Sequence, residues 1–196
     1  MAAEQEPVLT LPPEESAALT AAYEKAAVIL EYGTGGSTVV AARRTDCQVF
    51  SVESSADWLA KMQGWFAANP PRAALQLHYA DIGPTKDWGF PVDARRIARW
   101  SSYPVSVWDR DDFSHPDVVL IDGRFRLACA LTVLFRITRP IPVLIDDYVD
   151  RAGYRPIETL VGPPEMIGRM ASFHFTPQPM PPVHMAWIMT AFANPN

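Results

Sequence analysis

The chain has 196 residues, of which 48% are hydrophobic, and a formal net charge of -5. A chain of this length buries about 70% of its unfolded surface in one core, so we expect residues 1–196 to form a single domain. Nucleic-acid binding depends on clustered lysine and arginine, and only Arg95, Arg96 and Arg99 approach a cluster, which argues against a nucleic-acid partner.

The sequence also bears on the cellular compartment. Cys47 and Cys129 each lie in an apolar stretch, which is typical of buried thiols in a reducing cytosol. No apolar run reaches the roughly 18 residues that a membrane span requires, so we expect no membrane association. The acidic segment 1–7 lacks the basic and apolar regions of a secretion signal. We therefore expect a cytoplasmic protein.

Strand-like and helix-like segments alternate along the chain. Two prolines open the first helix, and Ser54 or Ser55 can cap the third, in which Trp58, Met62 and Phe66 share one apolar face. The expected helices cover 14–25, 38–43, a stretch after Ser55 and a stretch after 122. The expected strands cover 27–31, 49–52, 75–79, 118–121, 143–145, 170–175 and 184–192. This alternation predicts an α/β protein with a doubly wound, Rossmann-like, mostly parallel sheet of seven strands and helices on both faces.

The segment 83–113 is longer than an ordinary crossover and rich in aromatic residues. We expect one helix over 92–100, and Trp88 and Tyr103 are candidates for the wall of a ligand pocket. The competing interpretations are a hydrophobic flap and a subunit interface. A homodimer would supply the cover that the short N-terminal extension does not provide.

The first strand runs directly into a glycine turn, Glu31-Tyr32-Gly33-Thr34-Gly35-Gly36-Ser37-Thr38. Glycines at the end of a buried strand let the backbone turn tightly and approach a ligand closely. A phosphate-binding loop is excluded, because the turn lacks the Lys-Ser/Thr pair that such loops use. A carboxylate just before the glycines suits a ligand with hydroxyl or ammonium groups and repels a bare pyrophosphate.

Acidic residues follow the strands at regular positions, namely Glu31, Glu53, Asp81, Asp122 and Asp146. The carboxyl ends of parallel strands meet at one edge of a sheet, so five carboxylates should crowd one rim. Each pair at about 4 Å would repel by about 1 to 4 kcal/mol. Ligands, a metal or raised pKa values must therefore offset the repulsion.

This pattern resembles the class I S-adenosylmethionine-dependent methyltransferases, over residues 27 to 192. The resemblance implies that the glycine turn, with Glu31, Gly33 and Gly35, holds the methionine end of the cofactor. Ser37 stands where that family commonly has a third glycine, and serine is small enough to keep the close approach. Glu53 would accept hydrogen bonds from both ribose hydroxyls. Asp81 would face the adenine amino group, and the last strand would be antiparallel.

A second group of acids comprises Asp122, Asp146 and Asp147, at the ends of two predicted strands. It resembles the Mg²⁺ site of catechol O-methyltransferase and of macrocin-type sugar O-methyltransferases, which implies that Asp122 and Asp146 are catalytic and that all three acids bind the metal. The alternative is that these acids cap or stabilise turns. Arg124 and Arg126 follow closely, and either guanidinium could pair with Asp122, replace the metal or bind an anionic substrate.

The resemblance implies a methyltransferase that uses S-adenosylmethionine, acts on a small-molecule acceptor by O-methylation and is assisted by Mg²⁺. One alternative is a catalytically silent, methyltransferase-like protein that only binds the cofactor. Another is an NAD-binding Rossmann oxidoreductase, because Gly33, Gly35 and Glu53 also satisfy much of that fingerprint. Amino-methylation of nucleic acid is disfavoured, since no Asp/Asn-Pro-Pro-aromatic motif follows the strand 118–121. The sequence does not identify the acceptor.

Overall fold

A seven-stranded sheet in the order β3-β2-β1-β4-β5-β7-β6 runs through the computed structural model, which describes residues 5–196. Residues 1–4, and with them part of the acidic N-terminal segment, lie outside the described residues. The strands are β1 (Val28–Tyr32), β2 (Gln48–Glu53), β3 (Ala74–Tyr79), β4 (Val118–Ile121), β5 (Ile141–Ile145), β6 (Glu165–Ile167) and β7 (Met170–Phe175). Strands β1 to β5 pair in parallel, and β7 is antiparallel to both β5 and β6. The predicted doubly wound sheet is confirmed.

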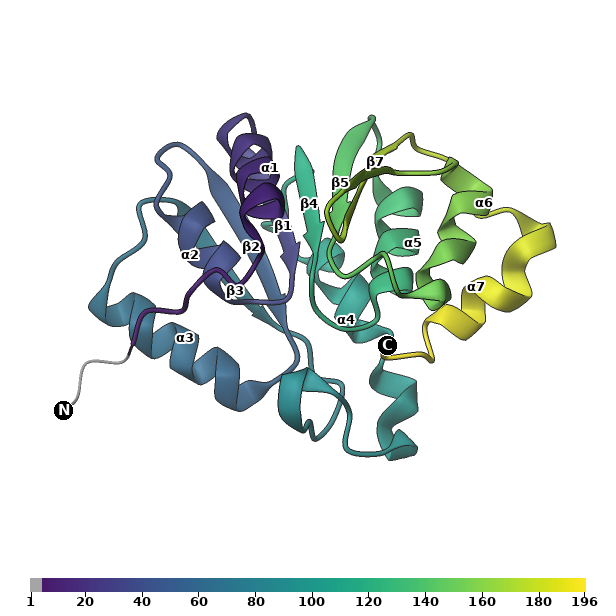
Figure 1. Cartoon of the computed structure of the whole chain (residues 1–196). Coiled ribbons are helices and arrows are strands. Elements are labelled where there is room, and N and C mark those ends of the chain that lie inside the picture. The colour runs from purple at the N-terminus through teal and green to yellow at the C-terminus, as the bar shows by residue number, and fades with distance from the viewer. Residues whose placement is uncertain (1–4) are drawn as a thin grey trace.

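Helices cover both faces of the sheet (Figure 1). One face carries α1 (Pro13–Glu24), α2 (Gly36–Ala42) and α3 (Ala56–Ala68), and the other carries α4 (Ser102–Val105), α5 (Arg126–Arg136), α6 (Glu158–Val161) and α7 (Met185–Ala191). Alternate strand residues enter different cores, because successive side chains of a strand point to opposite faces. Ile29 packs in the core that contains α1, and Leu30 packs in the core that contains α5.

The start of α3 corrects one expectation. Ser55 caps the helix as predicted, since its side chain accepts a hydrogen bond from the Trp58 amide. The sequence places Trp58 on the buried face, but this side chain is 37% exposed, and Leu59 is buried instead. The Trp58 indole Nε1 donates to the carbonyl of Thr34 at 2.7 Å. Trp58 therefore stabilises the glycine turn and is not part of the buried core.

The expected strand over 184–192 is wrong, because this segment forms helix α7. Ile188 and Ala191 are buried, whereas Met185 and Met189 are exposed, and burial every third residue fits a helix face rather than a strand. The strand that completes the sheet is β6, which precedes β7 and is only three residues long. So short a strand leaves no clear alternation to read in the sequence.

The remaining connections contain short 3-10 helices. The expected helix over 92–100 is one of these, η2 (Ala94–Arg99), and none of its residues is buried. The others are η1 (Asp87–Gly89), η3 (Ser106–Asp109), η4 (Ala152–Ile157) and η5 (Pro182–His184). Cys47 and Cys129 are buried free thiols, as predicted. Within residues 5–196, no helix has both the length and the apolar character to cross a membrane.

Candidate active site

The strand order brings together, at one edge of the sheet, the ends of the five strands that carry the predicted acids. Because β3, β2, β1, β4 and β5 are successive neighbours, the acids follow in the order Asp81, Glu53, Glu31, Asp122 and Asp146. Their expected repulsion is offset in two ways, by raised pKa values at three of the acids and by ion pairs to Arg99, Arg126 and Arg169. Of these three arginines, the sequence indicates only Arg126 as a partner for an acid.

The glycine turn packs directly against the loop after β4. Gly33 has a φ of +105°, and a Cβ added there would lie 2.8 Å from the Gly123 backbone nitrogen, so this position requires glycine. A Cβ at Gly35 would meet no atom within 4 Å, which leaves open space beside the turn. Gly36 lies against the backbone of Val8 and Leu9, so the N-terminal segment crosses the start of α2.

Glu31 lies beneath the turn rather than on the rim. Its side chain is fully buried on the face covered by α1, and the Tyr23 hydroxyl donates to Oε1 at 2.6 Å. Oε2 has no hydrogen-bond partner among the described residues. Burial raises the pKa of Glu31, against the hydrogen bond from Tyr23, which lowers it. Ser37 is buried one turn further along, at the start of α2.

Glu53 and Asp81 end neighbouring strands but differ in setting. Glu53 is 8% exposed, and its Oε1 accepts hydrogen bonds from the amides of Ser54 at 2.7 Å and Ser55 at 2.8 Å. Both bonds end on one oxygen, which leaves acceptor capacity on Oε2. Burial raises the pKa of Glu53. Asp81 is exposed and forms an ion pair with Arg99.

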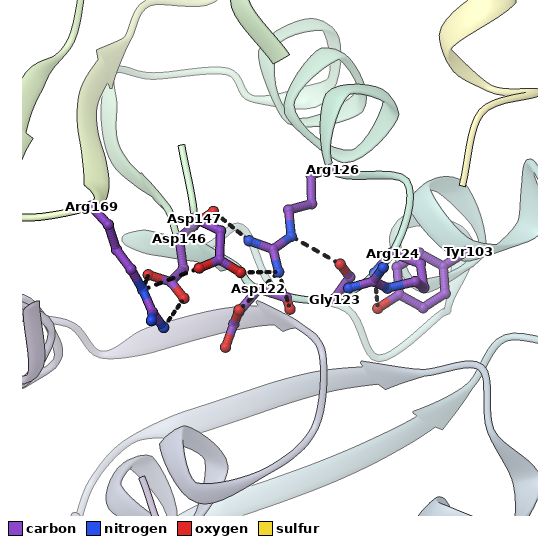
Figure 2. A network of polar contacts seen from close by, with 8 residues as sticks. All are labelled: Tyr103, Asp122, Gly123, Arg124, Arg126, Asp146, Asp147 and Arg169. Carbon is purple, nitrogen blue, oxygen red and sulfur yellow. Dashed lines mark hydrogen bonds and ion pairs between the residues drawn. The ribbon is translucent and has the colours of Figure 1, made fainter. Parts of the chain in front are cut away.

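The three acids of the predicted metal site do come together (Figure 2). Ligand oxygens of Asp122, Asp146 and Asp147 all lie within 4.8 Å of one another. Two arginines already form ion pairs with these carboxylates. Arg126, 4% exposed, reaches Asp122 Oδ1 at 3.1 Å and Asp147 Oδ2 at 3.4 Å. Arg169 bonds both oxygens of Asp146, at 3.1 and 2.8 Å, and also pairs with Asp147 at 3.1 Å.

These contacts decide how well the acids fit a metal. Arg126 is also held by backbone carbonyls, with Nε donating to Gly123 O at 3.0 Å and the other nitrogens to Asp122 O and Asp146 O. A divalent cation would have to displace a buried guanidinium that is bonded on every side, or share the acids with it. Mg²⁺ requires a near-octahedral shell of oxygens and waters. The donor set, as arranged, fits two guanidinium groups better than it fits Mg²⁺.

The pKa of Asp122 is raised to about 7. Burial is the main cause, the charges of Asp146 and Asp147 also raise the pKa, and the charge of Arg126 lowers it. About a third of its side chain is exposed, unlike that of Asp146, which is buried. Asp147 is exposed to the same extent, so an incoming ligand can reach Asp122 and Asp147 but not Asp146.

Arg124 has a different environment from Arg126. Its guanidinium carbon lies 4.2 Å above the centre of the Phe90 ring, and its backbone amide donates to the Tyr103 hydroxyl at 3.4 Å. Its Nε is buried and makes no hydrogen bond within residues 5–196. Of the two arginines that could pair with Asp122, Arg126 forms the ion pair.

Similar structures define the family. A methyltransferase-like protein of Silicibacter pomeroyi is 48% identical, with a TM-score of 0.93, over 97% of this chain and 99% of its own. The O-methyltransferase TomG of Streptomyces achromogenes, in complex with SAM, is 15% identical with a TM-score of 0.58, over 87% and 82% of the two chains. An RNA methyltransferase of Salinibacter ruber, in complex with S-adenosylhomocysteine, is 13% identical with a TM-score of 0.51, over 89% and 97%.

No protein-family model matches the chain, and no curated protein matches it either. The strand order, the antiparallel β7, the glycine turn and the 48% identical structure agree. The chain belongs to the class I S-adenosylmethionine-dependent methyltransferase superfamily. The two more distant structures share its fold only, and they act on different classes of acceptor, so the fold does not identify the acceptor.

Proposed function

We propose that residues 1–196 form a single-domain methyltransferase that transfers the methyl group of S-adenosylmethionine to a hydroxyl group of a small molecule. The observation that carries the proposal is Glu53, a buried carboxylate at the end of β2 beside the glycine turn, fixed by two amides of its own chain. That placement suits a carboxylate that accepts hydrogen bonds from two vicinal hydroxyls. The net charge of -5 supports a small-molecule acceptor over a nucleic acid.

The cofactor would lie across the glycine turn, where it supplies a methyl group carried on a sulfonium. Glu53 would accept the ribose hydroxyls, and the turn from Gly33 to Gly35 would hold the methionine end. The open space at Gly35 supports this placement, because no protein atom lies within 4 Å of an added Cβ. Asp81 is the candidate for the adenine amino group and would exchange its contact with Arg99 for the ligand.

The acceptor hydroxyl would meet Asp122. Arg126 holds Asp122 Oδ1 at 3.1 Å, so Oδ2 can accept a hydrogen bond or a proton from an incoming hydroxyl. Burial raises the pKa of Asp122 to about 7, which suits proton acceptance near neutral pH. Asp146 is buried against Arg169 and is a positioning residue in this scheme. Alignment supplies most of the remaining rate enhancement.

Magnesium assistance is the second version of this proposal, favoured by the three neighbouring carboxylates. We infer instead that Arg126 and Arg169 supply the positive charge that a cation would bring. Titration of Mg²⁺ by calorimetry into the wild type and into Asp146→Asn and Arg169→Gln tests this. We expect no binding by the wild type and a gain of binding by Arg169→Gln. Binding by the wild type that is lost in Asp146→Asn would favour the metal.

A catalytically silent cofactor-binding protein is the second candidate function, because Glu53 is only 8% exposed and lies under a neighbouring loop. Asp122→Asn separates the two candidates once an acceptor is found, since an enzyme should lose turnover while it keeps its affinity for S-adenosylhomocysteine. The homodimer and the cytoplasmic location stay predictions from the sequence.

Calorimetry with S-adenosylhomocysteine tests the main proposal. We expect the wild type to bind and Glu53→Ala to lose about 1.5 to 3 kcal/mol of binding free energy, the range for hydrogen bonds to a charged group. Glu24→Ala, at an exposed position on α1, is the matched control and should bind like the wild type. Binding of NADH in place of S-adenosylhomocysteine would overturn the proposal in favour of an oxidoreductase.

A further inference from the structure

A small loop folds over the β2 end of the rim. We call residues 85–91 the strap. Its ends are joined by a bridge between Thr85 and Pro91, and the Lys86 amide donates to the Phe90 carbonyl at 2.8 Å. At its tip, Trp88 has a φ of +62° and Gly89 a φ of +71°, both in the left-handed region. Trp88 is 87% exposed, although it is the largest side chain of the strap.

The strap lies directly on the acid that would bind the ribose. Gly89 is buried, and its carbonyl accepts a hydrogen bond from Ser54 Oγ at 3.2 Å. A Cβ added to Gly89 would lie 2.8 Å from Ser54 Oγ and 3.5 Å from Glu53 Oε1. Only glycine can lie so close to Ser54 and Glu53, so this position of the strap requires glycine.

The other side of the strap contacts the loop after β4. A Cβ added to Gly89 would lie 3.8 Å from Arg124 Cγ, and Phe90 lies under the Arg124 guanidinium at 4.2 Å. Strands β2 and β4 flank β1, so the strap reaches from the end of β2 to the loop after β4. Arg124 points away from the acid cluster and toward Tyr103 (Figure 2).

We propose that the strap fills the nucleoside half of the cofactor site, and that Arg124 is the residue on which the nucleoside base stacks once Phe90 has left. The inference rests on the proposed function. Arginine guanidinium planes stack on nucleobases as they stack on aromatic rings. Phe90 thus takes the position of a base on the face of the Arg124 guanidinium.

Two features of the strap favour its opening. A left-handed φ is disfavoured for tryptophan, so the closed form holds strain at Trp88 that a different conformation would relieve. Trp88 buries little surface, and moving it therefore exposes little apolar area. Opening breaks the Ser54 hydrogen bond and the Phe90 stack, and the cofactor can replace both.

Affinity for S-adenosylhomocysteine in the wild type and in Phe90→Ala provides the test. Removing the competing ring should tighten binding by about 3- to 30-fold, the range of a cation–π contact that no longer has to be broken. Trp88→Ala is the matched control, since it removes an aromatic residue from the same strap without touching Arg124, and it should bind like the wild type. Arg124→Met should weaken binding more in the Phe90→Ala background than alone, because alone it also releases Phe90.

Amide hydrogen exchange gives a second readout. The amides of Lys86, Phe90 and Val92 are hydrogen-bonded within or next to the strap, and they should exchange faster when S-adenosylhomocysteine is added. Protection of these amides by the ligand, or equal affinity of the wild type and Phe90→Ala, would contradict the proposed role of the strap and leave the proposed function intact. Failure of both proteins to bind, with both folded by circular dichroism, would instead overturn the proposed function.

Discussion

Arg126 and Arg124 are two residues apart, yet they create opposite environments on the two sides of the loop after β4. On the Arg126 side, the guanidinium is buried and bonded to Asp122, Asp147 and three carbonyls. On the Arg124 side, the guanidinium stacks on Phe90 and its Nε has no partner within residues 5–196. The Arg126 guanidinium therefore has its charge and hydrogen-bond donors paired, whereas the Arg124 guanidinium keeps a donor without a partner among the described residues. The difference indicates that the Arg126 guanidinium is structural and that the Arg124 guanidinium is free to take a ligand.

The largest effect that tests this comparison is expected from Arg126→Met. The variant leaves three carboxylates close together without a buried counterion, and we expect the free energy of unfolding to fall by about 3 to 5 kcal/mol. Arg124→Met is the control and should cost about 1 kcal/mol or less. Urea denaturation of both variants measures the difference, and equal losses would remove the distinction between the two sides.

Gly33→Ala tests the junction between the two sides. The substitution combines a left-handed φ with a Cβ placed 2.8 Å from the Gly123 nitrogen, so we expect a loss of about 2 kcal/mol or more. Gly35→Ala should change stability little, because its position is open, but it should weaken S-adenosylhomocysteine binding. Thermal unfolding and calorimetry read the two effects, and a Gly33→Ala protein as stable as the wild type would contradict the close packing.

The pH dependence of stability reports on Asp122. Its pKa is raised to about 7 in the folded protein, from about 4 in an unfolded chain. The folded state therefore holds a proton that the unfolded state releases, and this stabilisation is full below about pH 4 and lost as the pH rises through 7. From pH 5 to pH 8, the wild type should lose about 1 to 2 kcal/mol more than Asp122→Asn, after allowance for solvent screening.

Denaturation at both pH values measures this loss. Asp109→Asn, which changes an exposed acid paired with Arg136, should follow the wild type. Equal slopes for the wild type and Asp122→Asn would show that the Asp122 carboxylate is already ionised at pH 5.

The smallest effect on stability is expected from Phe90→Ala. A half-buried cation–π pair contributes about 0.5 to 1 kcal/mol, and the strap adds little else to the core. Urea denaturation should therefore detect a loss of that size, while Trp88→Ala should cost nothing or stabilise slightly. A loss of several kcal/mol for Phe90→Ala would mean that the strap is a fixed part of the fold.

Local sequence patterns predicted most of the sheet. Strands β1 to β5 and β7 are short apolar runs that end in acids or turns, and their periodicity is visible without any tertiary contact. The prediction was wrong for the C-terminal segment 184–192, because apolar residues in a short segment fit a strand as well as a helix. Its packing against α5 selected the helix.

The acids at the strand ends were likewise predictable, because parallel strands place their carboxyl ends together. Their partners were not. Arg169 lies on the turn between β6 and β7, and no local pattern connects it to Asp146. Its role depends on the antiparallel pairing of β7 with β5, which is a long-range contact.

The sequence by itself determined the class of fold and the rim on which the acids gather, because strand alternation and glycine turns are local properties of the backbone. Only the tertiary structure decided which arginine is buried among the acids and which one faces Phe90. Arg124 in the loop after β4 and Arg126 at the start of α5 are close enough in sequence for either guanidinium to reach the acids, and the burial of charge against distant carboxylates selects between them.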